Sequence, residues 1–187
     1  GVGKTQVARI LAKMYYGLGI LESDTVVEVA PNEFFATGYG SVEQRSRDIF
    51  ERAMGGVLFI DEAYSLYQDG IVGGDAAGSK VIDALLATME NNRDRLVVIV
   101  AGYEGAMNSF LERNAGLESR FAKRIRFPSY QPAELVDIAM SMARSTYGAA
   151  LTDAATAEVA RAVGHLCTTT ETAPNGDTRT LIDREGN

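Results

Sequence analysis

The chain has 187 residues, of which 46% are hydrophobic and 23% are charged, a composition typical of a folded domain. Its formal net charge of −7 disfavours nucleic-acid binding, because proteins that bind the phosphate backbone carry an excess of Lys and Arg. A single cysteine, Cys167, and a single histidine exclude an internal disulfide and a Cys/His zinc site, and fit a reducing cytoplasm. No apolar run approaches the roughly eighteen residues of a membrane span.

The first part of the chain predicts helices that alternate with short strands. After the opening GVGKT, apolar residues recur at helical spacing as far as Leu18, where two glycines end the helix. TVVEVA at 25–30 is β-branched and predicts a strand, and a helix is predicted over 46–54. The wholly apolar VLFI at 57–60 predicts a strand buried on both faces, as in a parallel sheet.

The alternation continues to residue 128. The Gly-rich segment 68–79 predicts a flexible loop, and residues 81–89 have the apolar spacing of a helix. LVVIVA at 96–101 predicts a second buried strand, and RIRFP at 124–128 predicts a further short strand. We therefore expect residues 1–128 to form an α/β domain of three layers.

Beyond residue 128 the pattern changes to helices without strands. Pro132 lies where a helix favours proline, and an apolar stripe follows it as far as Met142. An Ala-rich helix is predicted over 151–166, and the polar segment 168–187 is predicted to be a loop. Residues 129–187 are therefore expected to form a partial helical subdomain.

The opening GVGKT is the second half of a phosphate-binding loop, G-x-x-x-x-G-K-[ST]. In such a loop the backbone N–H groups surround the phosphates, the lysine reaches the terminal ones, and the Ser/Thr hydroxyl binds Mg²⁺. The alternative is a Gly-rich turn that only caps a helix. The candidate residues for binding nucleotide are Gly1, Val2, Gly3, Lys4, Thr5 and Gln6, with Thr5 also a candidate magnesium ligand.

Two carboxylates follow the apolar strand in VLFIDEAYSL. Ligands in open α/β folds bind at the carboxyl ends of the strands, which is where Asp61 and Glu62 are expected. Asp61 is predicted to hold Mg²⁺, and Glu62 to orient a water for attack on the γ-phosphate. An acidic strand end that turns into solvent is the alternative. Together with GVGKT, the pair predicts hydrolysis of a nucleotide with Mg²⁺.

Four segments, in this order and spacing, resemble the AAA+ ATPases of the CbbX type: ARILAKMYYGLGIL, AMGGVLFIDEAYSL, MENNRDRLVVIVAGY and NAGLESRFAKRIRFPSY. This group includes the red-type Rubisco activase, the type VII secretion ATPase EccA and stage V sporulation protein K. The final LIDREGN is similar to the EccA branch. The resemblance implies a P-loop three-layer sandwich with a parallel sheet, followed by a helical lid.

The resemblance also assigns roles to single residues. It implies that Lys4 and Thr5 belong to Walker A, and Asp61 and Glu62 to Walker B. The sensor 1 position falls on Tyr103, whose hydroxyl would position the attacking water, or which has a structural role only. The arginine in GLESRF, Arg120, resembles the arginine finger that enters the neighbouring subunit's site. Its rivals are Arg113 and Arg124, and the alternative is a solvated cation at a helix end.

In rings of this kind, a loop after the second strand lines the central pore. Tyr39, between two glycines in FFATGYGS, has the aromatic character of that loop and would grip a protein client in a hexameric ring. The alternative is an aromatic residue packed under a surface turn.

The resemblance further implies that a strand preceding Gly1 lies in the middle of the sheet, between segments 124–128 and 96–101. We therefore expect the chain to be a fragment of a longer protein, with the sensor 2 arginine just past Asn187. We expect the isolated fragment not to hydrolyse ATP.

The leading hypothesis is an EccA-like motor of type VII secretion that uses ATP to remodel a protein client. A CbbX-like Rubisco activase is the alternative within the family. A P-loop metabolite kinase and a scaffold that binds nucleotide without turnover are the alternatives from other classes.

Overall fold

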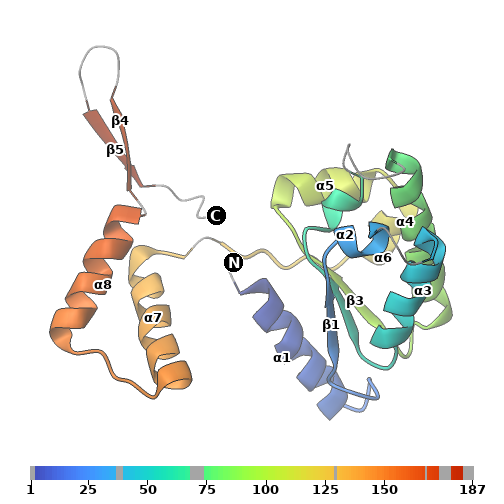
Figure 1. The fold of residues 1–187 in the computed structure, drawn as a ribbon, viewed down its shortest axis with the longest axis horizontal. Coiled ribbons are helices and arrows are strands. Elements are labelled where there is room, and N and C mark those ends of the chain that lie inside the picture. Colours follow the sequence, from blue (N-terminus) through green and yellow to red (C-terminus); the bar gives the residue numbers. More distant parts are fainter. Residues whose placement is uncertain are drawn as a thin grey trace. The chain divides into compact units, whose positions relative to one another are not determined.

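The computed structural model describes residues 3–36, 40–67, 74–128, 130–166, 168–172 and 178–182. The chain divides into two compact units, Gly3–Arg126 and Phe127–Asn187, each of which is described by itself (Figure 1). This division lies close to the predicted boundary at residue 128. The role of the second unit as a lid stays a prediction.

A parallel sheet forms the centre of the first unit. Its three strands lie in the order β1 (Val26–Val29), β2 (Val57–Ile60) and β3 (Val97–Val100). All of β2 is buried, as its apolar sequence predicts. β3 is only half-buried, because within the described residues it has a strand partner on one side alone, so the expectation of a fully buried strand there is wrong.

Helices cover both faces of this sheet, which confirms the predicted three-layer α/β architecture. α1 (Lys4–Gly17) lies on one face, and α3 (Val42–Ala53) and α4 (Gly74–Asn91) lie on the other (Figure 1). The alternation along β2 explains this arrangement. Val57 and Phe59 pack on the α1 side, whereas Leu58 and Ile60 belong to the large core that includes α3 and α4.

The buried face of α1 agrees only in part with the predicted apolar stripe. Ala8 and Ala12 are 1% and 0% exposed, because their small side chains let the helix backbone approach the sheet closely. Ile10, Met14 and Leu18, all members of the predicted stripe, are 54%, 47% and 67% exposed. Val7, Leu11 and Tyr15 of the same stripe are half-buried, so the prediction holds on the side of α1 next to Ala8 and Ala12 and is wrong for the other side.

Short helices complete the first unit. α3 begins before the predicted start at residue 46, because the Ser41 hydroxyl accepts a hydrogen bond of 3.2 Å from the Gln44 amide and caps the helix at Val42. The remaining elements of this unit are α2 (Asn32–Phe35), η1 (Ala63–Tyr67), α5 (Glu104–Glu112) and α6 (Ala115–Arg120).

The predicted loop over 68–79 is wrong for residues 74–79, which belong to α4. Gly78 is a glycine of close approach rather than of flexibility. A Cβ at this position would lie 1.9 Å from the carbonyl oxygen of Leu66, because α4 crosses η1 at this point. Residues 68–73 lie outside the described residues.

We expect Gly78→Ala to destabilise the protein by about 1–3 kcal/mol, because the new Cβ collides with backbone that cannot rotate away. Gly105→Ala is the matched control, since Gly105 also lies in a helix but has no atom within 4 Å of an added Cβ. The control is expected to be neutral or stabilising by up to about 1 kcal/mol. Urea denaturation of the full-length protein measures both changes, and equal effects would contradict the close approach.

The predicted strand at 124–128 is also wrong, since residues 121–128 have no regular secondary structure. A strand needs a neighbour to pair with its backbone, and among the described residues this segment pairs with none. Two side chains of this segment instead contact α5. Arg124 donates to Asn108 Oδ1 at 3.0 Å, and Arg126 pairs with Glu104.

The second unit contains α7 (Pro132–Tyr147), which packs against α8 (Asp153–Leu166), and the antiparallel strands β4 (Thr168–Thr172) and β5 (Thr178–Ile182). Both helices were predicted, and Glu134 completes a capping box at the start of α7. The predicted loop over 168–187 is wrong for the two strands, where β-branched threonines favour extended backbone. Across the described residues, no helix is both long and apolar enough to cross a bilayer.

Candidate nucleotide site

The candidate site lies where the strands of the parallel sheet end. The ladder continues past β2, since the Asp61 amide donates to Val29 O at 3.1 Å and the Ala101 amide donates to Ile60 O at 2.9 Å. Asp61 and Glu62 therefore leave the sheet beside the last residues of β1 and β3. This is the edge at which α/β folds bind ligands.

Lys4, the first residue of α1, contacts the same edge. Its Nζ donates to Gly102 O at 3.4 Å and lies 5.5 Å from the centroid of the Tyr103 ring. The N-cap residue Gly3 has φ +83°, a conformation that favours glycine. The first N–H groups of a helix have no partner within it and carry partial positive charge, which suits phosphate.

The other predicted binding residues differ in their exposure to solvent. Thr5 is half-buried and Gln6 is exposed on the first turn of α1. Gly1 and Val2 lie outside the described residues. Among the residues described, no three His, Cys, Asp or Glu side chains gather as a metal site. Thr5 and Asp61 offer the oxygen ligands that Mg²⁺ favours, and Mg²⁺ at nucleotides commonly takes its other ligands from phosphate and water.

Glu62 has a strained backbone. Its φ of +50° is in the left-handed region, which is uncommon outside glycine and costs about 1–3 kcal/mol. Hydrogen bonds on both sides hold this conformation: the Glu62 amide donates to Asp61 Oδ1 at 3.1 Å, and the Ser65 amide donates to Glu62 O at 2.8 Å. Both carboxylates are exposed, so they are accessible to a ligand.

Two tyrosine rings, one after β2 and one after β3, lie against each other. The rings of Tyr64 and Tyr103 have centroids 6.3 Å apart and are tilted by 41°. Burial raises the pKa of the Tyr64 hydroxyl above its usual value, and the nearby Glu62 carboxylate raises it further. Sequence reasoning missed Tyr64. No short motif marks it, because its contact with Tyr103 comes from tertiary packing.

The candidate arginine finger is held within its own chain. Arg120, at the end of α6, donates from Nη2 to Glu90 Oε2 at 3.1 Å and from Nη1 to Gly116 O at 3.4 Å. Glu90 also pairs with Arg93. These contacts do not include Lys4, Asp61 or Glu62. The structure therefore places Arg120 on α6 without bringing it to the site residues of its own chain.

The rival arginines have partners too. Arg113 donates to Tyr67 O at 3.2 Å and lies 4.8 Å from the centroid of that ring. Arg124 donates to Asn108, as described above. Tyr39, the predicted pore-loop residue, lies outside the described residues, as does Cys167.

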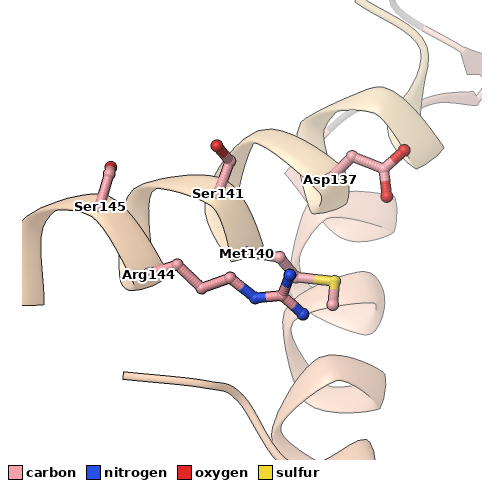
Figure 2. Close-up of a pocket in the computed structure, with 5 residues that line it drawn as sticks. All are labelled: Asp137, Met140, Ser141, Arg144 and Ser145. Atoms are coloured by element: carbon pink, nitrogen blue, oxygen red, sulfur yellow. The ribbon is translucent and has the colours of Figure 1, made fainter. Parts of the chain in front are cut away.

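The second unit has a pocket on α7, shown in Figure 2. All of its lining residues come from this one helix, and Met140 and Arg144 extend on the same side of it (Figure 2). The lining residues are Asp137, Met140, Ser141, Arg144 and Ser145. The pocket contains none of the predicted nucleotide-binding residues.

Comparison with known proteins identifies the family. Residues 1–129 match the family described as "ATPase family associated with various cellular activities (AAA)". The chain belongs to the AAA family. This confirms the predicted resemblance and the predicted P-loop fold class. An AAA domain implies nucleotide binding.

Three relatives of this AAA chain carry secretion-system names. The chain is 44% identical over 187 residues to the ESX-3 secretion system protein EccA3 of Mycolicibacterium smegmatis, covering 100% of the chain and 30% of the relative. It is 46% identical over 155 residues to the ESX-1 secretion system protein EccA1 of Mycobacterium tuberculosis strain H37Rv, covering 83% and 27%. Over 143 residues it is 48% identical to EccA3 of the same strain, covering 76% and 22%. The chain thus spans less than a third of these relatives.

Proposed function

We propose that this chain is the nucleotide-binding part of an AAA motor that hydrolyses ATP and remodels a protein client. The observation that carries the proposal is the meeting of three features at one edge of the sheet. Lys4 begins α1 against the end of β3, and Asp61 and Glu62 follow the end of β2. A membership in the AAA family supports the same conclusion.

The residues divide the chemistry among them. Lys4 and the amides of the loop and first turn bind the phosphates, and Thr5 and Asp61 hold Mg²⁺, which neutralises charge on the phosphates. Glu62 accepts hydrogen bonds from water and can remove a proton as the water attacks. Its strained backbone fixes where the carboxylate leaves the strand.

Catalysis also involves a second subunit in this proposal. Arg120 supplies positive charge to the neighbour's transferring phosphoryl group, in a ring that we propose to be hexameric and cytoplasmic. Within its own chain Arg120 contacts Glu90 and Gly116, so its assignment to the neighbour's site rests on the resemblance of GLESRF to the arginine-finger segment. Tyr39 is proposed to contact the client. Tyr103 is proposed to act beside Lys4 at the end of β3.

The relatives favour a secretion role. Their names place them in ESX-3 and ESX-1 secretion systems, so we propose that the client belongs to type VII secretion. The Rubisco activase alternative is not favoured by these names. The neighbouring reading frames separate the two, because secretion components are expected beside this gene, whereas Rubisco subunits there would contradict the assignment.

The destination of the γ-phosphate tests the reaction itself. In a single turnover of the full-length protein with Mg·ATP, we expect inorganic phosphate in solution without any added acceptor. Transfer that occurs only with a small-molecule acceptor would favour a P-loop kinase. Tight binding without any product would favour a scaffold that is controlled by nucleotide.

A further inference from the structure

The ammonium group of Lys4 contacts two residues that follow β3. Its Nζ donates to Gly102 O at 3.4 Å and lies 5.5 Å from the centroid of the Tyr103 ring. A cation near the face of an aromatic ring is attracted by the ring's negative π-face. One N–H of the ammonium donates a hydrogen bond to the Gly102 carbonyl, so the others are available to a phosphate.

Other side chains pack against Gly102 and Tyr103, the two residues that contact Lys4. A Cβ at Gly102 would lie 2.8 Å from Met107 Sδ and from two ring atoms of Tyr64, so these side chains close directly against the Gly102 backbone. The Tyr64 ring also lies against the Tyr103 ring. The carbonyl and the aromatic ring that contact Lys4 therefore lie against packed, half-buried side chains.

We propose that Gly102 O and the Tyr103 ring form a cradle that orders the Lys4 side chain before nucleotide binds. Tyr103 is then a positioning residue that acts through Lys4, in addition to any role of its hydroxyl. A lysine side chain loses rotamer freedom when it is fixed on a ligand. A cradle that orders the side chain in the free protein removes part of this cost from binding. The inference rests on the proposed function, since it assumes that Lys4 binds phosphate.

The ring and the hydroxyl of Tyr103 can be tested separately in the full-length protein. Tyr103→Leu removes the ring and is expected to weaken Mg·ATP binding about two- to fivefold. Tyr103→Phe keeps the ring and is expected to retain the affinity. Tyr103 is 54% exposed, so neither change should unfold the domain. Tyr16→Leu, at a position on α1 that is 52% exposed, is the matched control and should leave the affinity unchanged.

A double-mutant cycle separates positioning from a structural role. In a Lys4→Ala background, Tyr103→Leu should cause no further loss, because the side chain that the ring orders is gone. An equal loss in both backgrounds would overturn the cradle. If Lys4→Ala itself leaves ATP affinity unchanged, the proposed phosphate role of Lys4 fails instead, so the two failures are distinguishable.

An NMR measurement without nucleotide covers the case in which Lys4→Ala binds too weakly to measure. Reductive ¹³C-methylation labels lysine amines and keeps their charge. The Lys4 signal, assigned by its loss in Lys4→Arg, should be shifted upfield by the Tyr103 ring. The shift should persist in Tyr103→Phe and disappear in Tyr103→Leu. A Lys4 signal at the position of an exposed lysine in the unmutated protein would overturn the cradle.

Discussion

Glu62→Gln in the full-length protein is expected to keep its affinity for Mg·ATP while its hydrolysis rate falls by at least about a hundredfold. In the proposed mechanism, binding depends on Lys4 and on backbone amides, which this substitution leaves in place. An amide cannot take a proton from the attacking water, so only the chemical step should suffer. Because glutamine has nearly the same shape, it can keep the left-handed backbone at residue 62.

Affinity and turnover should be measured on the same preparation of Glu62→Gln. Glu51→Gln, at an exposed position on α3, is the matched control and should change neither quantity. Turnover of Glu62→Gln close to that of the control would remove Glu62 from the mechanism. A loss of affinity together with turnover would assign Glu62 to nucleotide binding instead.

The second large effect concerns Arg120. Homogeneous rings of Arg120→Ala are expected to bind ATP but to hydrolyse it about a thousandfold more slowly, because the neighbour no longer supplies positive charge. Lys4→Ala subunits have the opposite defect, since they retain Arg120 but bind phosphate poorly. When the two variants are mixed before assembly, some sites combine an intact Lys4 with an intact Arg120. Activity should partly return in the mixture.

The outcome of mixing separates action on a neighbour from action within the chain. If Arg120 acts within its own chain or only stabilises α6, the mixture will show no more than the average of the two parents. Arg93→Ala is the matched control, because Arg93 shares the Glu90 carboxylate with Arg120. It should retain activity. Subunit exchange should be confirmed independently by mass spectrometry.

The parts of the fold that could be predicted are those that depend on local pattern. VLFI identified the central strand because a strand buried on both faces needs an unbroken apolar run. The starts of α7 and of the strand β1 also agree with their local signals. By contrast, the glycines around Gly78 have the composition of a loop. The close contact of Gly78 with Leu66 depends on tertiary packing, which no local pattern contains.

Other predictions were wrong where pairing or packing with another segment decides the local structure. Segment 124–128 was predicted to be a strand from its short run around Ile125 and Phe127, but a strand also needs a neighbour to pair with. The apolar stripe of α1 places its half-buried side correctly, but the most buried positions are Ala8 and Ala12, whose small side chains allow the closest approach to the sheet. The β4 and β5 pair shows the reverse case, in which two polar segments become strands by pairing with each other.

The parts of the candidate site that belong to short sequence motifs could be predicted. The parts that depend on tertiary contacts between side chains could not. Lys4, Asp61 and Glu62 were found from short motifs with a known spacing. Their role in catalysis stays a proposal. Tyr64 and Gly102 could not be found in this way, because their importance comes from packing between the ends of β2 and β3. The partnership of Arg120 with Glu90 joins residues 30 positions apart and has no local signal either.

The central claim is that Lys4 at the end of the sheet binds the phosphates of ATP, and one affinity measurement tests it most directly. The dissociation constant of Mg·ATP should be determined for the full-length protein, for Lys4→Ala, and for Lys13→Ala, which changes an exposed lysine on the same helix. We expect Lys4→Ala to bind about ten- to a hundredfold more weakly, since it loses a charge-assisted contact with phosphate, and Lys13→Ala to bind normally. Equal affinities for the two variants would contradict the account.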